Sequence, residues 1–183
     1  MKIISGEFKG RTIKGYDIDG TRPTMDRVKE SLFGSIQNYI SDSIVLDLFA
    51  GTGNLGLEAL SNRAKYCYFN DINIKCTKFI QNIVKELNIS DRCKILNMNY
   101  KNALKYFVNN NIKFDIIFLD PPYKMEILNE IINYIKENDL IKPNGLIVCE
   151  IDNLYLDIDY YEKIKEKKYG SKYIVIYKNT LLT

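Results

Sequence analysis

Short apolar runs alternate with longer amphipathic segments along the chain from about Ser43 onward. Runs of this length with few polar positions are typical of strands buried on both faces of a sheet, and they predict strands at Ile44–Leu48, Tyr66–Phe69, Cys93–Leu96, Phe114–Leu119 and Gly145–Glu150. The segments between them have apolar residues at helical spacing, which predicts helices at Asn54–Asn62, Ile74–Leu87, Lys101–Val108 and Met125–Asn138. This alternation indicates an α/β fold with a mostly parallel sheet and helices on both of its faces.

The two ends of the chain have a different pattern. Residues 2–14 alternate around a glycine-containing turn and predict a small hairpin, and Met25–Asn38 is expected to be a helix. Residues 143–145 (Pro-Asn-Gly) predict the turn that leads into the fifth strand. Near the C-terminus the pattern predicts an antiparallel hairpin formed by Tyr161–Tyr169 and Lys172–Lys178. No repeat or linker interrupts the chain, so we expect one domain with an N-terminal extension.

Composition narrows the class of protein only moderately. Hydrophobic residues make up 46% of the 183 residues and charged residues 27%, which is ordinary for a folded globular protein. The formal net charge of +3 permits a polyanionic partner without indicating one. The apolar run at the start is too short for a secretory signal, and the longest apolar stretch, near Ile116–Leu119, is too short to span a membrane. We therefore expect a cytoplasmic protein without membrane contact, and a monomer by default.

The absence of histidine excludes several chemistries. With no histidine, the chain cannot carry Ser-His or Cys-His nucleophilic catalysis or a histidine general base. Its four cysteines are not arranged as C-x-x-C, so we expect reduced thiols and no metal site at Cys67, Cys76, Cys93 and Cys149.

A glycine-rich loop follows the first predicted strand. Gly51, Gly53 and Gly56 form G-x-G-x-x-G between a strand and a helix, which is typical of nucleotide-like cofactors in general. Asp47 lies just before this loop, where a carboxylate would repel a pyrophosphate. S-adenosyl-L-methionine instead carries an ammonium and a sulfonium group, which a carboxylate attracts. The sign of the charge therefore favours S-adenosylmethionine as the cofactor over a dinucleotide.

Further cofactor contacts are expected at the ends of the next two strands. Asp71 lies 18 residues beyond Gly53, where an acid can accept hydrogen bonds from ribose hydroxyls, although it could instead cap the following helix. After the third strand, Asn99 could bond the adenine amino group and Tyr100 could pack on the ring. Together with the loop itself, the predicted cofactor-binding residues are Asp47, Phe49, Ala50, Gly51, Gly53, Asn54, Asp71, Ile72, Asn99 and Tyr100.

The sequence Asp120-Pro121-Pro122-Tyr123, directly after the fourth strand, is the strongest catalytic signal. In a doubly wound sheet the end of the fourth strand lies beside the end of the first, where ligands bind. The Asp120 carboxylate and the Pro121 carbonyl can accept hydrogen bonds from both hydrogens of an exocyclic amine, which leaves its lone pair aimed at a methyl donor. Pro122 helps to fix the turn, and Tyr123 can stack on a base. We therefore predict Asp120, Pro121, Pro122 and Tyr123 as catalytic residues.

Basic residues gather near the N-terminus. Lys9, Arg11 and Lys14 are opposed only by Glu7, and further basic residues follow in the next turn and helix at Arg22, Arg27 and Lys29. Such a cluster suits phosphate contacts, although it could also be an ordinary solvated face. Thr24 is expected to begin the helix and to cap it.

With these motifs in place, the chain resembles the class I methyltransferases and, more closely, the RsmD-type family that methylates the 2-amino group of a guanine in small-subunit rRNA. The resemblance rests on IISGEFKGRTIK, TRPTMDRVKESLF, VLDLFAGTGNLGLEAL and FLDPPY. It implies a Rossmann-like, seven-stranded sheet ending in an antiparallel hairpin, and a 16S-type rRNA substrate within an assembling ribosomal subunit. It also implies that Thr24 and Arg27 lie over the active site. The predicted RNA contacts are Lys9, Arg11, Arg22, Thr24 and Arg27, and the predicted division is an RNA-contacting extension, 1–40, and a catalytic domain, 41–183.

Three other functions fit parts of the pattern. An adenine amino-methyltransferase acting on DNA or RNA could use D-P-P-Y equally well, although a DNA enzyme would usually need an added recognition domain. A nicotinamide-dependent oxidoreductase could share the glycine loop, but Asp47 and D-P-P-Y argue against it. A non-catalytic RNA-binding module would not be expected to keep Gly51, Gly53, Asp71 and Asp120.

Overall fold

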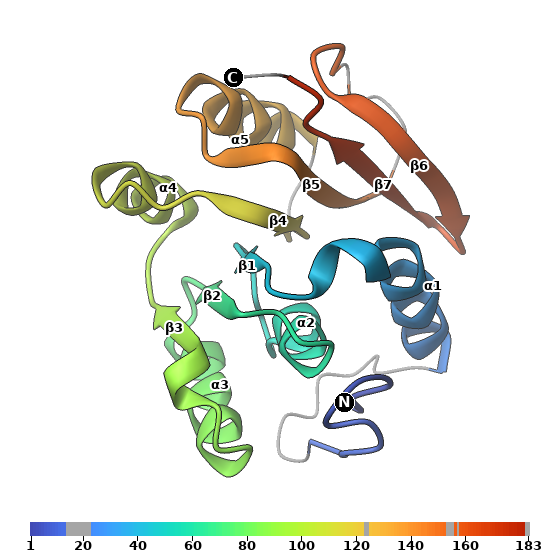
Figure 1. Cartoon of the computed structure of the whole chain (residues 1–183), viewed down its shortest axis with the longest axis vertical. Coiled ribbons are helices and arrows are strands. Elements are labelled where there is room, and N and C mark those ends of the chain that lie inside the picture. The colour runs from blue at the N-terminus through green and yellow to red at the C-terminus, as the bar shows by residue number, and fades with distance from the viewer. Residues whose placement is uncertain (14–22, 123–124, 153–155, 157, 182–183) are drawn as a thin grey trace.

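The computed structural model describes residues 1–13, 23–122, 125–152, 156 and 158–181. Within these residues a single sheet has seven strands in the order β3-β2-β1-β4-β5-β7-β6 (Figure 1). The strands from β3 to β5 are parallel, while β7 is antiparallel to both β5 and β6. This confirms the predicted class I methyltransferase architecture. The strands are β1 Ile44–Asp47, β2 Tyr66–Asn70, β3 Cys93–Leu96, β4 Phe114–Leu119, β5 Ile141–Ile151, β6 Glu162–Tyr169 and β7 Lys172–Lys178.

The helices cover both faces of the sheet because the strand residues alternate between two cores. Val45, Ile116 and Phe118 belong to the core that contains the buried residues of α1, α2 and α3. Leu46 and Ile117 point the other way and pack with α4 and α5. The helical elements are α1 Pro23–Ile40, α2 Asn54–Ser61, α3 Ile74–Glu86, the short 3-10 helix η1 Ser90–Arg92, α4 Tyr100–Asn109 and α5 Met125–Glu137.

The close approach of α2 to the sheet depends on Gly56. A Cβ atom at this position would lie 2.2 Å from a ring carbon of Phe69 and 2.8 Å from the sulfur of Cys67. The third glycine of the loop motif therefore serves helix-to-sheet packing, as it does in nucleotide-binding folds generally.

The predicted start of the fifth strand is wrong. β5 begins at Ile141, so the Pro-Asn-Gly sequence at residues 143–145 lies inside the strand. The chain still bends there, because Asn144 has a φ of 62° and the pairing with β4 shifts register between Phe114 and Ile116. The side chain of Asn179 donates to the carbonyls of Ile141 and Lys142, which satisfies backbone groups at the irregularity. This contact comes from 37 residues or more along the chain, so the local pattern gives no sign of it.

The N-terminal segment forms the predicted hairpin, closed by an antiparallel bridge between Lys2 and Thr12 rather than by long strands. Ile3 donates to the carbonyl of Arg11 at 3.0 Å, and Gly10 donates to the carbonyl of Ile3 at 2.8 Å. The hairpin lies beside α1 and α2 (Figure 1). Its contacts with the main domain therefore decide where its basic side chains lie.

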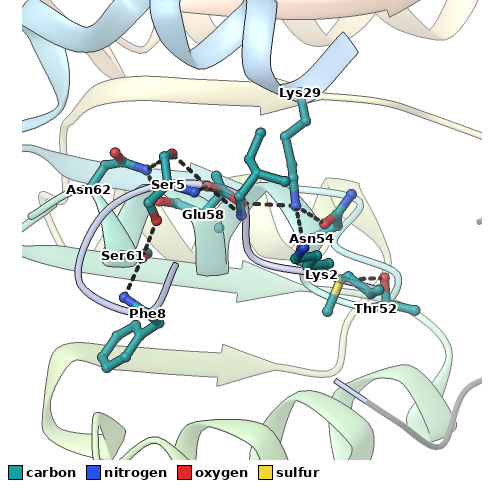
Figure 2. Close-up of polar contacts among 12 residues, drawn as sticks. Lys2, Ser5, Phe8, Lys29, Thr52, Asn54, Glu58, Ser61 and Asn62 are labelled. Carbon is teal, nitrogen blue, oxygen red and sulfur yellow. Dashed lines mark hydrogen bonds and ion pairs between the residues drawn. The ribbon is translucent and has the colours of Figure 1, made fainter. Parts of the chain in front are cut away.

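A buried ion pair joins α1 and α2 beneath this hairpin (Figure 2). The ammonium of Lys29 lies 2.8 Å from a carboxylate oxygen of Glu58, and the two side chains are 2% and 0% exposed. Lys29 also donates to the carbonyl of Lys2 at 2.6 Å and to the side-chain oxygen of Asn54 at 2.8 Å. The Glu58 carboxylate accepts from the backbone N–H and the hydroxyl of Ser5. Every charge in this pair is therefore matched by hydrogen bonds, as burial requires.

The expected place of Lys29 in an exposed basic cluster suited to phosphate contacts is therefore wrong. Its ammonium is enclosed by Glu58, Asn54 and the N-terminal backbone and does not face solvent. An isolated lysine in a helix gives no sequence signal of burial when its carboxylate partner lies on another helix.

Lys29→Met is expected to reduce the free energy of unfolding by about 3–5 kcal/mol, because it leaves the Glu58 carboxylate buried without its counter-charge. Urea unfolding followed by circular dichroism measures this loss. Lys101→Met is the matched control, since it removes the lysine of an exposed pair with Glu130 and should change stability little. Equal stabilities for the two variants would contradict the structural role of the buried pair.

Candidate active site

Three carboxylates meet at one edge of the sheet. β1 pairs with β2 on one side and with β4 on the other, and all three strands are parallel. Asp47 is the last residue of β1, Asp71 follows β2, and Asp120 follows β4. The charges of Asp71 and Asp120 both act on Asp47. The carboxyl ends of these strands, where the strand order of the sheet reverses between β1 and β4, therefore carry the acidic residues expected from the sequence.

The glycine loop turns sharply above this edge. Gly51 and Gly53 have φ angles of 54° and 78°, in the left-handed region that favours glycine. The N–H of Gly53 closes the turn on the carbonyl of Ala50 at 2.7 Å, and the N–H of Ala50 bonds the carbonyl of Asn70 at 2.9 Å. A Cβ atom at Gly51 would meet nothing within 4 Å, so this part of the loop borders open space. A ligand can approach its backbone there.

Asp47 holds the helix that follows the loop. Its buried carboxylate accepts a hydrogen bond from the N–H of Gly56 at 2.9 Å, in the first turn of α2. Gly53, at the cap position of that helix, has no side chain to do so. The pKa of Asp47 is raised to about 7, mainly by burial and also by the charges of Asp120 and Asp71, while the Gly56 bond lowers it. A cation near Asp47 would favour the ionised form.

Asp71 connects the glycine loop to the turn after β2. One carboxylate oxygen accepts from the N–H of Gly51 at 2.8 Å, and the other accepts from the N–H of Asn73 at 2.8 Å. Asn73, and not Asp71, caps α3 by accepting from the N–H of Lys75. The alternative role considered for Asp71, capping the next helix, is therefore wrong. Ile72 beside it is 74% exposed, which is unusual for a large apolar side chain next to a polar loop.

A hollow of about 580 Å³ continues from Ile72 along α4 as far as Asn109, the last residue of that helix. Asn97, Met98, Asn99 and Asn102 contribute to its lining. The side-chain oxygen of Asn99 caps α4 by accepting from the N–H of Asn102 at 2.9 Å, so this oxygen already has a partner.

Two aromatic residues predicted to bind the cofactor lie in contact at the same edge. The Tyr100 ring lies 5.8 Å from the Phe49 ring, with an angle of 45° between their planes. The structure therefore brings together residues from the end of β1 and the start of α4.

Asn70 is a residue that sequence reasoning missed. Its side-chain amide is 2% exposed and donates to the carbonyls of Leu48 and Met98, both at 3.1 Å. It thereby connects the ends of β1 and β3 across β2. Its side-chain oxygen has no hydrogen-bond partner among the described residues. The signal in the sequence is an amide at the end of an otherwise apolar strand, YCYFN.

Asp120 lies at the end of β4, next to charged groups from two other strands. Its pKa is raised to about 7, mainly by burial and also by the charges of Glu150 and Asp152, while the charge of Lys172 lowers it. Lys172 forms an ion pair with Glu150. Burial lowers the pKa of Lys172, but its hydrogen bond to Glu150 and the surrounding carboxylates raise it overall. Glu150 and Lys172 were not expected at the site, because neither belongs to a recognisable motif.

The rest of the D-P-P-Y sequence is only partly described. Pro121 is half-buried and Pro122 is exposed, at the same edge as Asp120. Tyr123 lies outside the described residues, so its stacking role stays a prediction.

The predicted RNA contacts whose burial the structure describes are all exposed. Lys9 and Arg11 in the hairpin and Arg27 in α1 are exposed. Arg22 lies outside the described residues. α1 begins at Pro23, so Thr24 is inside the first turn and the expectation that it caps the helix is wrong.

The residues at this edge fit S-adenosylmethionine. The open backbone at Gly51 allows close approach, the Asp47 carboxylate has the sign that the cations of the donor require, and the exposed Ile72 borders a hollow lined by Asn97, Met98 and Asn99. Asp71 has carboxylate oxygens that can accept further hydrogen bonds. Among the described residues no group of three or more His, Cys, Asp or Glu could hold a metal ion. Nor is any helix in the described ranges both long and apolar enough to cross a membrane.

Comparisons with known proteins find similar methyltransferases. The ribosomal RNA small subunit methyltransferase D of Haemophilus influenzae is 35% identical over 182 residues, which cover 98% of this chain and 94% of the relative. The solved structure of yhhF from Escherichia coli superimposes with a TM-score of 0.86 at 26% identity, covering 100% of this chain and 99% of that chain. An RNA methyltransferase from Salinibacter ruber, solved in complex with S-adenosyl-L-homocysteine, shares the fold with a TM-score of 0.68 at 10% identity, covering 90% of this chain and 95% of its own.

The family match extends over almost the whole chain. Residues 1–178 match the family described as Conserved hypothetical protein 95. The chain therefore belongs to this family, the RsmD family of S-adenosylmethionine-dependent methyltransferases that the sequence motifs resemble.

Proposed function

We propose that this chain transfers a methyl group from S-adenosylmethionine to the 2-amino group of a guanine in small-subunit rRNA, within an assembling ribosomal subunit. The observation that supports this most directly is the position of Asp120 and Pro121 at the same sheet edge as the glycine loop and Asp47. The proposal also rests on relatives that are named small-subunit rRNA methyltransferases. A nicotinamide-dependent oxidoreductase is no longer a competing function, because the chain belongs to a methyltransferase family.

In this proposal the cofactor is held by the residues that surround the glycine loop. Bound S-adenosylmethionine supplies an electrophilic methyl group on a sulfonium. Asp47 faces its positive charge, Asp71 accepts hydrogen bonds from the ribose, and Ile72 covers one face of the adenine. Phe49, Ala50, Gly51, Gly53, Asn54, Asn99 and Tyr100 complete the proposed set of contacts.

Asp120 and Pro121 prepare the acceptor nitrogen. The lone pair of a 2-amino group is delocalised into the guanine ring, so the amine is a poor nucleophile. Hydrogen bonds from its two hydrogens to the Asp120 carboxylate and the Pro121 carbonyl favour a pyramidal nitrogen. As the nitrogen–carbon bond forms and the carbon–sulfur bond breaks, positive charge develops on the nitrogen beside Asp120, and the nitrogen then loses one of its two protons to give the neutral methylamino group. A carboxylate fixed in advance at this place stabilises that charge without reorganising.

The RNA is proposed to approach over the N-terminal extension. Lys9, Arg11 and Arg27 are exposed, and the hairpin that carries the first two is anchored to α2 through Glu58. The division into an RNA-contacting extension, 1–40, and a catalytic domain, 41–183, is part of this proposal, and so are the RNA contacts at Arg22 and Thr24.

The test of the reaction is methyl transfer from labelled S-adenosylmethionine to small ribosomal subunits that lack the modification, followed by nucleoside digestion and mass spectrometry. We expect 2-methylguanosine, with more transfer to subunit particles than to naked rRNA. Methylated adenosine would keep the chemistry but contradict the base. Absence of transfer despite measurable donor binding would contradict the proposed substrate.

Asp120→Ala is expected to lower kcat by about 100-fold or more, because it removes a group that stabilises the transition state, while donor binding stays nearly unchanged. The variant should remain folded. Burial holds the pKa of Asp120 at about 7, above its ordinary 3.8, so ionising this carboxyl opposes folding as the pH rises through that interval. Near-normal turnover by the alanine variant would contradict the role of Asp120.

The same pKa predicts the pH dependence of the rate. At subsaturating donor and RNA we expect kcat/KM, which reports ionisation of the free enzyme, to rise as the pH increases through about 7, because the ionised Asp120 stabilises the developing positive charge and its neutral form does not. Asp120→Asn retains a hydrogen-bond acceptor but should lose this rise. A rise that persists in the asparagine variant would assign the titration to another group.

Lys9→Gln combined with Arg11→Gln is expected to weaken RNA binding and to reduce the salt slope, the dependence of log affinity on log salt, by about 1.4, since each contact with a single-strand phosphate contributes about 0.7. The control combines Lys113→Gln with Lys142→Gln, which changes the net charge equally. These two lysines lie just before β4 and at the start of β5, at the opposite edge from Asp120. Equal slopes for the hairpin variant and the control would show that the hairpin does not contact RNA.

A further inference from the structure

Asp120 is the first of three charged residues that form a row across neighbouring strands of the sheet. The other two are Glu150 and Lys172. Leu119 pairs with Cys149, so Asp120 and Glu150 are the next residues at the same level of the neighbouring strands β4 and β5. Their side chains lie on the same face as Phe118 and Val148, two residues earlier, which pack in the core under α1. α1 packs on this face of the sheet, and its residue Arg27 is exposed.

Lys172 reaches the same row from β7. Glu150 pairs with Ile174, and Lys172 lies two residues before Ile174, so both point to the same face of the sheet. The ammonium of Lys172 is bonded to the Glu150 carboxylate. Across the sheet, the order of charged groups is therefore an acid on β4, an acid on β5 and a cation from β7.

These groups are fixed in place and accessible at the same time. The Glu150 side chain is 24% exposed and that of Lys172 is 51% exposed. Asp152, which follows β5, is exposed and adds a further carboxylate beside them. A planar ligand held by Asp120 would meet Glu150 and Lys172 next along the row.

The hydrogen-bonding edge of guanine has a matching order. Its 2-amino group and N1–H are donors, and its O6 is an acceptor. The row offers an acceptor at Asp120, an acceptor at Glu150 and a donor at Lys172. Adenine with its amino group at Asp120 would instead place the acceptor N1 against the Glu150 carboxylate, and two acceptors without a proton between them repel each other.

We propose that Glu150 and Lys172 are the specificity-determining pair, with Glu150 accepting from guanine N1–H and Lys172 donating to O6 while Asp120 holds the 2-amino group. This inference rests on the proposed function, because it concerns how the enzyme recognises the base that receives the methyl group. The pair distinguishes guanine from other purines that carry the same reactive amine. Without such a role it would be an ordinary cross-strand ion pair near the edge of the sheet.

The experiment uses rRNA in which the guanine methylated by the wild-type enzyme is replaced by 2,6-diaminopurine, assembled into small subunits. This base keeps the 2-amino group but presents an unprotonated N1 and a 6-amino donor. We expect the wild-type enzyme to prefer guanine by roughly 10- to 100-fold in kcat/KM, the range typical of one well-placed base contact. Glu150→Gln should lose most of this preference, because its amide can donate to the unprotonated N1. Lys172→Met should narrow the preference too, since it removes the cation that faces the 6-amino group.

The control is Asp115→Asn. Asp115 forms an ion pair with Lys142 between the same two strands, β4 and β5, at the opposite edge of the sheet. This variant should keep the full preference for guanine, even if its stability falls. Donor affinity measured by calorimetry should be unchanged in all three variants.

The outcomes distinguish a failure of this inference from a failure of the proposed function. If the wild-type enzyme forms no methylguanosine, the proposed function fails. If it methylates guanine but Glu150→Gln and Lys172→Met keep the wild-type preference over 2,6-diaminopurine, the specificity pair is wrong and the proposed function stands. Should Glu150→Gln not fold, Lys172→Met gives the same test without changing the carboxylate.

Discussion

The buried ion pair between Lys29 and Glu58 is the interaction on which the arrangement of the rest depends. It joins α1 to α2, and through the backbone of Lys2 and Ser5 it also fixes the N-terminal hairpin. α2 begins directly after the glycine loop, and Lys29 bonds Asn54, the first residue of that helix. The hairpin with its exposed basic residues, α1 and the start of α2 after the glycine loop are therefore connected through this one pair. A buried charge pair suits this purpose because removing either partner is far more costly than removing an exposed pair.

The second constraint is electrostatic. Three aspartates share one sheet edge, and burial raises the pKa of two of them, Asp47 and Asp120, to about 7. Such a cluster opposes folding at neutral pH unless a positive charge is near. The proposed reaction brings positive charge twice, first on the methyl donor and then on the acceptor nitrogen. Active sites commonly trade stability for function in this way, because charges placed in advance need not reorganise during the reaction.

The sequence predicted the central fold well because its signals were local. Runs such as FDIIFL and amphipathic helices such as α5 can be recognised from neighbouring residues, and the G-x-G-x-x-G and D-P-P-Y motifs lie at strand ends whose position follows from the topology. Two of the errors have a common physical cause. The burial of Lys29 and the early start of β5 each depend on a distant partner or a backbone angle that the local pattern does not reveal, whereas the capping of α3 by Asn73 was a local signal directly before the helix.

By itself, the sequence determined the α/β architecture, the position of the glycine loop and of D-P-P-Y at strand ends, and the resemblance to the RsmD family. These follow from hydrophobic periodicity and from short motifs, each of which consists of a few neighbouring residues. Only the tertiary structure placed Glu150 and Lys172 beside Asp120 and enclosed Lys29 against Glu58. The reason is that these contacts join residues 22 or more positions apart, and their meeting depends on strand register and helix packing rather than on the residues themselves.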